Sequence, residues 1–277
     1  MIITIVPNRI RPDTDRLAAA VAARLTAAGA TVRVTEDATL PPLADLTAAL
    51  AGSDAAIAIG GDGTIMHVAK AAAAANCPVL GVNGGRLGFL AGIEPEELEA
   101  LDGLLQGKYT VDERALLAIT VHTVAGERTL LAMNEAVVAR GSLSRLVDVT
   151  VTAAGRTVMT CRGDGVIIAT PTGSTAYSLS AGGPVVDPAV ACTLLTPVCP
   201  HALDSRARVL PAHIPLTIRA TAADGEQAFI TVDGEENISL GSADSVTVGP
   251  ADLTARLIRL TGTDFYDGLR HKLSDRR

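Results

Sequence analysis

Short apolar runs alternate with segments of helical spacing over the first hundred residues. Residues 2–6 and 55–59 are nearly continuous apolar runs of the kind that form buried parallel strands. Between them, Leu17, Val21 and Leu25 recur every four residues, which is typical of one face of a helix. Further strands are predicted at 31–35 and 78–82, and further helices at 43–50, 65–75 and 94–105. This repeated order predicts a parallel sheet covered by helices on both faces.

The pattern changes near Gly107. From there to about residue 261, short β-rich stretches are separated by Gly, Pro and Asp, which predicts many antiparallel strands. Examples are residues 116–124, 135–139, 147–152, 165–169, 216–220, 229–232 and 245–248, with a short helix expected within 174–180. We therefore expect an α/β domain over residues 1–106 and a β-rich domain over 107–263.

The tail of the chain has the spacing of an amphipathic helix. Phe265, Leu269 and Leu273 follow one another at intervals of four residues. These three side chains share one helical face, so a helix over about 264–277 is expected to dock against another part of the protein.

Composition narrows the class of protein. The chain is 48% hydrophobic but only 2% aromatic, and no run of about 18 apolar residues is present, which argues against a membrane-spanning helix. The first residues read as a strand rather than a signal peptide, so we expect a cytoplasmic protein without a membrane partner. A net charge of −7, without a basic block and with few aromatic residues, argues against a nucleic-acid partner.

Four cysteines show no zinc-type spacing, and no two histidines have the spacing of metal ligands. We therefore predict no protein metal site of this kind and expect reduced thiols in the core.

A glycine-rich segment, Gly60-Gly61-Asp62-Gly63-Thr64, joins a predicted strand to a predicted helix. Unobstructed backbone N–H groups and the positive end of the helix dipole would seat phosphate oxygens there. Asp62 does not suit a simple anion cradle, which suggests a proton acceptor or a metal-bridged contact. The alternative is a tight turn in which Asp62 caps the helix. P-loop, Rossmann and nucleophile-elbow motifs are absent.

A second cluster of polar motifs lies in the β-rich half. Asn134-Glu135 and Arg162-Gly163-Asp164-Gly165 precede the fifteen residues T-P-T-G-S-T-A-Y-S-L-S-A-G-G-P at 170–184. Hydroxyls, glycines and Tyr177 at this density suit a polar ligand with a planar ring. The alternative is an ordinary Gly/Ser/Thr loop.

These motifs together resemble the NAD kinase family over about residues 55–273. GGDGT is shared with diacylglycerol and sphingosine kinases, but residues 82–90 are similar to the NAD kinase segment G-x-N-x-G-x-L-G-F-L. Asn134-Glu135 matches the family's NE motif, and 164–184 is close to its long signature. Residues 199–201 and 264–273 also fit later segments of the family.

The resemblance implies phosphorylation of the adenosine 2′-hydroxyl of NAD to NADP, with ATP or polyphosphate as donor and a divalent metal such as Mg²⁺. It also implies an α/β domain, a β-rich domain, a last helix that returns to the first domain, and a homodimer or homotetramer.

Roles follow from the resemblance residue by residue. Asp62 would be the catalytic base, and Gly61, Gly63 and Thr64 would hold the phosphates of the donor. The residues implied for NAD binding are Asn134, Glu135, Arg145, Arg162, Asp164, Thr175, Ala176, Tyr177, Ser178, Ser180 and Glu235. For Arg145 and Arg162 there are two interpretations: contact with pyrophosphate or with another subunit, or simple solvation at the surface.

Some positions depart from the family pattern. Residues 6–9 replace the usual opening and receive no role. Gly84 stands where a bulkier residue is common and is expected to loosen its turn. Glu235 stands where the family more often has Gln, which puts a charge beside the nicotinamide half.

Two rival functions share part of the pattern. A lipid kinase would share only the glycine loop and needs an apolar acceptor pocket, whereas the second cluster is polar. A non-catalytic NAD sensor would gain little from Asp62 beside phosphates.

Overall fold

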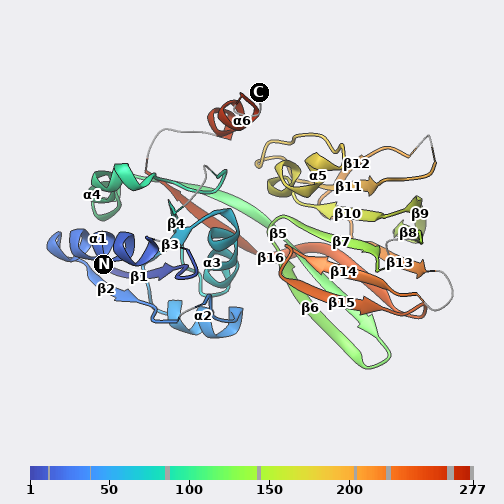
Figure 1. Ribbon diagram of the computed structural model, residues 1–277, viewed down its shortest axis with the longest axis horizontal. Coiled ribbons are helices and arrows are strands. Elements are labelled where there is room, and N and C mark those ends of the chain that lie inside the picture. Colours follow the sequence, from blue (N-terminus) through green and yellow to red (C-terminus); the bar gives the residue numbers. More distant parts are fainter. Residues whose placement is uncertain are drawn as a thin grey trace. The chain divides into compact units, whose positions relative to one another are not determined.

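The structure is a computed structural model that describes residues 1–11, 13–37, 39–84, 88–141, 145–202, 205–222, 226–260 and 265–274 (Figure 1). It contains two compact units. The α/β unit is Met1–Arg114 with Leu253–Arg277, and the β unit is Ala115–Asp252. Gly85, Arg86 and Leu87 of the predicted 82–90 motif lie outside the described residues, as do Asp264 and the side chain of Leu273.

The α/β unit is built on a parallel sheet. Its strands lie in the order β2-β1-β3-β4, and the end of β16 runs parallel to β4, with Leu257 opposite Val79. Helix α1 packs on α4, and α2 packs on α3. The elements are β1 (Ile2–Pro7), α1 (Thr14–Ala27), β2 (Thr31–Val34), α2 (Leu43–Leu50), β3 (Ala55–Gly60), α3 (Asp62–Ala74), β4 (Val79–Asn83), η1 (Pro95–Ala100), α4 (Leu101–Leu105) and α6 (Phe265–Ser274).

Burial explains the apolar runs of this unit. Every residue of β3 is buried, as expected for a strand in the middle of a parallel sheet. On α1, Val21 and Leu25 of the predicted stripe are buried together with Ala18, whereas Leu17 is partly buried at the edge of the same cluster. Val21 and Leu25 join Ile5 in one core cluster. The continuous apolar runs therefore belong to a strand that is buried along its whole length, and the helical spacing belongs to a helix that is buried on one face.

Two local predictions need correction. The helix expected over 94–105 is instead a 3-10 helix, η1, followed by the short α4, and within η1 Glu97 has non-helical dihedrals (φ −103°, ψ 21°). Gly84 does not loosen its turn. Its N–H donates to the Gly60 carbonyl at 2.9 Å, and a β-carbon on Gly84 would lie 3.1 Å from Gly60 Cα.

The β unit contains a six-stranded antiparallel sheet in the order β12-β11-β10-β7-β14-β15. Strands β8, β9 and β13 pair antiparallel in a second layer, in which β13 also pairs with β16 and β5 pairs with β6. Its core combines residues from both layers, such as Val138 and Ile168 with Val149 and Ile218.

The remaining elements are β5 (Thr110–Thr123), β6 (Gly126–Ala132), β7 (Glu135–Arg140), β8 (Val147–Ala153), β9 (Arg156–Gly163), β10 (Gly165–Ala169), η2 (Thr172–Thr175), α5 (Tyr177–Ser180), β11 (Cys192–Val198), β12 (Arg208–Pro211), β13 (Leu216–Ala222), β14 (Ala228–Val232), β15 (Glu236–Leu240) and β16 (Ser245–Arg259).

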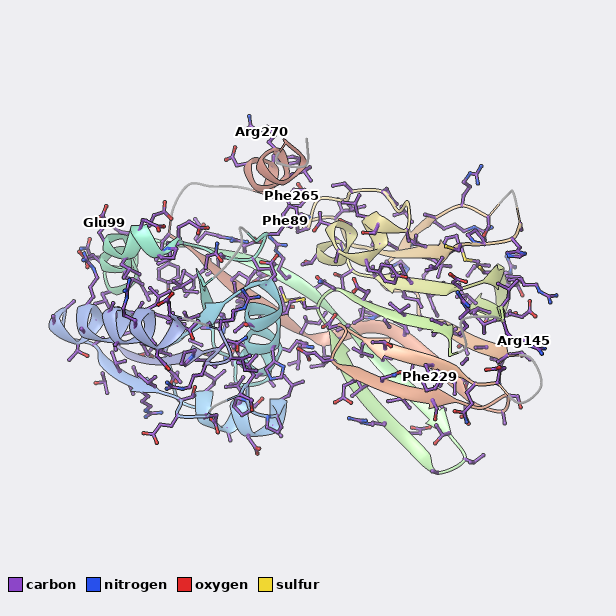
Figure 2. All side chains as sticks on the ribbon, viewed as in Figure 1. Phe89, Glu99, Arg145, Phe229, Phe265 and Arg270 are labelled. Carbon is purple, nitrogen blue, oxygen red and sulfur yellow. The ribbon has the colours of Figure 1, made fainter. Side chains whose placement is uncertain are left out.

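Helix α6 belongs to the α/β unit. The ring centroid of Phe265 lies 6.4 Å from that of Phe89 (Figure 2). The ring of Tyr266 meets Phe265 edge-on, with 5.3 Å between the two centroids. Half of the six Phe and Tyr residues of the chain therefore gather at this point. None of the described helices is long and apolar enough to cross a membrane.

Candidate active site

Asp62 is the first residue of α3. The preceding Gly61 is the N-cap, with an extended backbone (φ −88°, ψ −177°) and no capping side-chain hydrogen bond. The helix therefore begins three residues before the predicted position, and Asp62 does not occupy the N-cap position that the alternative interpretation gave it. Its carboxylate instead accepts the N–H of Phe89 at 2.9 Å on Oδ2 and the N–H of Leu90 at 3.1 Å on Oδ1.

Gly88 permits this contact. A β-carbon on Gly88 would lie only 1.9 Å from Asp62 Oδ1, so a larger residue would push the loop away from the carboxylate. Each carboxylate oxygen of Asp62 accepts one backbone N–H from this loop, and a carboxylate oxygen can accept a second hydrogen bond. The loop thus fixes the orientation of the Asp62 carboxylate.

The glycine loop is supported by the segment after β1. The amide of Asn8 donates to Thr64 Oγ1 at 2.8 Å, and Thr64 is only 4% exposed. The guanidinium of Arg11 covers Gly61, because a β-carbon there would lie 3.1 Å from its Nη2. A β-carbon on Gly63 would meet no atom within 4 Å, so its backbone is open. Open amides, a helix start and a cation suit phosphate oxygens.

In the β unit, Asp233 holds the NE motif in place. It lies in the turn between β14 and β15 with a left-handed backbone (φ 48°). Its carboxylate accepts the N–H groups of Met133 at 2.8 Å, Asn134 at 2.9 Å and Glu135 at 3.1 Å. Three backbone donors on one carboxylate fix the start of β7 rigidly.

Glu135 combines burial with an unused acceptor. The residue is 8% exposed, and its Oε2 is buried without a hydrogen-bond partner among the described residues. Burial, and after it the negative charge of Asp233, raises the pKa of Glu135 to about 7, while the backbone N–H of Tyr177 acts in the opposite direction. A buried polar atom without a partner in the protein is costly and is ready to bind a polar ligand.

The signature segment folds back on the NE motif. Strands β7 and β10 are antiparallel with Glu135 opposite Ala169, so the chain leaving β10 passes Asn134. The N–H of Thr170 donates to the Asn134 carbonyl at 2.8 Å. A β-carbon on Gly173 would lie 2.2 Å from that carbonyl oxygen, so only glycine fits.

A cavity of about 200 Å³ opens beside this turn. Its lining includes Asp164 and Tyr177 together with Arg140, whose Nε lies 2.7 Å from Asp164 Oδ1. Tyr177 is 44% exposed, so its ring is accessible. An aromatic face, an ion pair and apolar strand residues suit a ring with polar substituents.

The other predicted NAD-binding residues occupy different environments. Ser180 is exposed, and Thr175 and Ala176 are half-buried beside Tyr177. Ser178 differs from them, because it is fully buried and its hydroxyl bonds Thr196 at 2.8 Å, which gives it a role in anchoring α5 rather than an open face.

Three predicted charges do not line the cavity: Arg145, Arg162 and Glu235. Arg145 is exposed, as Figure 2 shows. The Arg162 side chain is 69% exposed and lies 3.9 Å from Asp148. Glu235 is exposed in the β14–β15 turn.

Sequence reasoning missed Asn8, Arg11, Arg140 and Asp233 as site residues. Asp233-Gly234 between two strands is a turn signal, and it could have drawn attention to Asp233. The others show their positions only through contacts with residues distant in sequence.

The described residues contain no group of three or more His, Cys, Asp or Glu that could hold a metal ion. Three of the four cysteines are buried as expected, and burial raises the pKa of the Cys77 thiol to about 11. Cys199 is the exception, because it is exposed in a turn with φ 43°.

Comparison with known proteins identifies the family. The ATP-NAD kinase N-terminal domain matches residues 43–109, and the ATP-NAD kinase C-terminal domain matches residues 133–260. An NAD kinase of Symbiobacterium thermophilum is 47% identical over 80% of this chain and 78% of its own. An NAD kinase of Lachnoclostridium phytofermentans is 35% identical over 98% of both chains.

Two solved structures share the fold. Yeast NADH kinase complexed with NADH superposes with a TM-score of 0.86 at 24% identity, over 99% of this chain and 87% of that one. An NAD kinase from Archaeoglobus fulgidus in complex with ATP superposes with a TM-score of 0.78 at 23% identity, over 99% of both chains. The α/β unit with its parallel sheet and the antiparallel β unit confirm the predicted fold class. With two family domains spanning most of its length, the chain belongs to the ATP-NAD kinase family.

Proposed function

We propose that the protein transfers the γ-phosphoryl group of ATP to the adenosine 2′-hydroxyl of NAD, giving NADP and ADP. Family membership supports the activity. The observation that carries the mechanism is the position of the Asp62 carboxylate. Asp62 is the first residue of α3, and the N–H groups of Phe89 and Leu90 orient its carboxylate.

Asp62 acts as the general base. It accepts the proton of the 2′-hydroxyl as the oxygen attacks the γ-phosphorus, a new P–O bond forms, and the bond to the β,γ-bridging oxygen breaks so that ADP leaves. Phosphoryl transfer depends mainly on positioning and charge stabilisation, so one oriented base with phosphate-binding donors accounts for the chemistry.

The donor phosphates bind at the glycine loop. Gly61, Gly63 and Thr64 supply backbone N–H groups, as the resemblance implies, and Arg11 adds a positive charge over Gly61. Asn8 holds Thr64 in place through its hydroxyl.

A divalent cation such as Mg²⁺ would be held largely by the phosphate oxygens of the donor and by water, with at most one or two carboxylates. When bound, the ion would neutralise charge on the transferred phosphoryl group.

NAD binds in the β unit. Glu135, with its unused Oε2, accepts ribose hydroxyls, and Asn134 beside it offers an amide that both donates and accepts. The ring of Tyr177 lies against the adenine, with Asp164, Thr175, Ala176 and Ser180 around it. We omit Ser178 because it is buried, and we give Arg145, Arg162 and Glu235 no direct contact. The resemblance also implies a homodimer or homotetramer, which light scattering would test.

The test is Asp62→Asn. The variant is expected to bind NAD within a few-fold of the wild-type affinity by calorimetry but to lose at least about 100-fold in turnover, the order contributed by a general base. Asp45→Asn is the matched control, because Asp45 is an exposed acid in the first turn of α2. Its turnover should match the wild type.

Wild-type turnover of Asp62→Asn would show that Asp62 is not the base. A wild-type protein that binds NAD but forms no NADP with ATP and magnesium would be a sensor. Parallel assays with polyphosphate and NADH define the donor and acceptor range.

A further inference from the structure

The loop that orients Asp62 is itself held from behind by an arginine at the end of β16. The Arg259 guanidinium donates to the carbonyl of Ala91 at 2.7 Å and to that of Leu90 at 3.3 Å, and its Nη2 lies 3.5 Å from the carbonyl oxygen of Phe89. Phe89 and Leu90 are the same residues whose N–H groups bind the Asp62 carboxylate. One side chain therefore binds one edge of this short loop, and Asp62 binds the other.

Asp112 fixes Arg259 in turn. Its Oδ2 lies 3.1 Å from Arg259 Nη2, and the buried Arg114 donates to both carboxylate oxygens of Asp112 at 2.8 and 2.5 Å. Burial alone would raise the pKa of Asp112, but the hydrogen bonds and charges of Arg114 and Arg259 hold it below its ordinary value. Asp112 is therefore a charged anchor.

Burying the charged side chain of Arg259 costs free energy, which its hydrogen bonds must offset. Its side chain is only 16% exposed, and this burial lowers its pKa, with the charges of Asp112 and Asp62 acting in the opposite direction. Removing an arginine from water is unfavourable unless its donors are satisfied. Its fork-shaped guanidinium reaches three successive carbonyls and one carboxylate, a pattern that a lysine cannot reproduce.

The end of the loop at Gly92 is closely packed against β4 and β16. A β-carbon on Gly92 would lie 2.7 Å from the carbonyl oxygen of Ile258, and the N–H of Gly92 donates to Gly81 on β4 at 2.8 Å. The loop is thus clamped between β4 and β16, and Arg259 sets the position of the part that meets Asp62.

We propose that Arg259 is a positioning residue for the phosphoryl transfer: by clamping the carbonyls of residues 89–91 it aims the Phe89 and Leu90 N–H groups at Asp62 and so fixes the catalytic carboxylate. This inference rests on the proposed role of Asp62 as base. Arg259 touches neither substrate nor the reacting atoms in this proposal and acts only through the loop.

The test is a double-mutant cycle with Asp62. Arg259→Met should lower kcat by about 10- to 100-fold, the cost of a small misplacement of a catalytic group, while the KM for NAD changes less than about three-fold. Arg259→Lys should recover part of the loss. In an Asp62→Asn background Arg259→Met should cause no further loss, because the group that it positions is gone.

Arg256→Met is the matched control. Arg256 lies on the same strand, is half-buried, and also donates to a backbone carbonyl, but that carbonyl belongs to Asn76, at 2.6 Å, and not to the loop at 89–91. Its kcat should be unchanged in both backgrounds.

Gly88→Ala tests the same loop from its other side and serves if Arg259→Met does not fold. Its β-carbon would meet the Asp62 carboxylate and displace the loop from it, so this variant should give the same kcat loss and the same absence of further loss with Asp62→Asn.

The failures can be told apart. Wild-type turnover of Asp62→Asn would overturn both the proposed base and this inference. Loss of turnover in Asp62→Asn, combined with wild-type kcat in Arg259→Met or with equal losses in both backgrounds, would overturn the role of Arg259 alone.

Discussion

At the scale of single residues, the site depends on carboxylates in unlike surroundings. Asp62 and Asp233 each accept backbone N–H groups, whereas Glu135 keeps an oxygen without a partner among the described residues. Hydrogen bonds from N–H groups stabilise a carboxylate, and burial beside another acid destabilises it. The raised pKa of Glu135, about 7, follows from this difference and leads to a measurable pH dependence.

Glu135 should make the free protein less stable at high pH. Its folded-state pKa of about 7 lies above the ordinary 4.5, so the native state binds the extra proton in this window. The stabilising contribution is complete below about pH 4.5 and is lost as the pH rises through 7, up to roughly 3 kcal/mol. Glu135→Gln should therefore unfold at higher denaturant than the wild type at pH 8, and the two should converge near pH 5.

The affinity for NAD should have the opposite pH dependence from the stability of the free protein. If ribose hydroxyls donate to the Glu135 carboxylate, binding favours the ionised form, so affinity rises with pH up to about 7 and binding near pH 6.5 releases protons. Calorimetry in buffers of different ionisation enthalpy measures that release. Glu135→Gln should abolish it, and proton release unchanged in this variant would assign it to another group.

The sequence predicted these acids unevenly. Asp62 and Glu135 stand inside recognisable motifs, so residue type and position alone make them candidates for site residues. The partners of Asp62 are backbone amides 27 and 28 residues away, and the carboxylate that holds Asn134 is 99 residues away. Such contacts depend on tertiary structure, which single-sequence patterns do not encode.

At the scale of elements, the turn after β10 is the part of the proposed NAD site where an added side chain would come closest to the backbone. Thr170 holds it twice, through its N–H to the Asn134 carbonyl at 2.8 Å and its hydroxyl to the Met133 carbonyl at 2.6 Å. Gly173 then passes so close to Asn134 that a β-carbon would lie 2.2 Å from the carbonyl oxygen. The turn and the NE motif therefore form one packed block.

Gly173→Ala should push the turn after β10 away from the NE motif. Because the contact is with rigid backbone, the turn must shift, which is expected to raise the KM for NAD by at least about 10-fold and to destabilise the protein by about 1–3 kcal/mol. The KM for ATP should change little. Steady-state kinetics and chemical denaturation measure these effects.

Gly249→Ala is the matched control for size, because its β-carbon would make only an ordinary 3.6 Å contact with Pro215. An NAD KM in Gly173→Ala equal to that of Gly249→Ala would separate this turn from the NAD site.

The types of the elements followed from the spacing of hydrophobic residues, but the residues at which the elements begin and end did not. The buried run of β3 and the stripe of α1 are where the pattern placed them. The helix predicted over 94–105 divides into η1 and α4, and α3 begins one turn earlier than predicted. These limits depend on local dihedrals, such as those of Glu97, and on contacts of the 88–90 loop, rather than on hydrophobic spacing.

At the scale of the whole molecule, the change of pattern near Gly107 corresponds to a change from parallel to antiparallel pairing, and the predicted fold class is confirmed. The sequence could not show that β5 and β16 each contribute residues to both units, since a long strand reads the same wherever it is cut. The domain limits taken from the sequence stay a prediction. The division matters for the proposed function, because the glycine loop and the NE motif belong to different units.

This division predicts that the two substrates protect different segments from hydrogen exchange. ATP with magnesium should protect the amides at the start of α3, including Gly63 and Thr64, because phosphate oxygens accept from them. NAD should protect residues 134–135 and the 170–177 turn. At a ligand concentration of 100 Kd the stabilisation is about 2.7 kcal/mol, which slows by roughly 100-fold those amides that exchange through opening of the occupied site.

The experiment uses the full chain, with each ligand added singly so that no turnover occurs, and the Asp62→Asn variant for both together. Protection of 134–135 by ATP alone, without protection at Gly63 and Thr64, would contradict the assignment of the donor to the glycine loop. Protection of both segments in the variant, together with its loss of turnover, would separate the binding of the substrates from the chemistry, because the only group removed is the one assigned to take the proton.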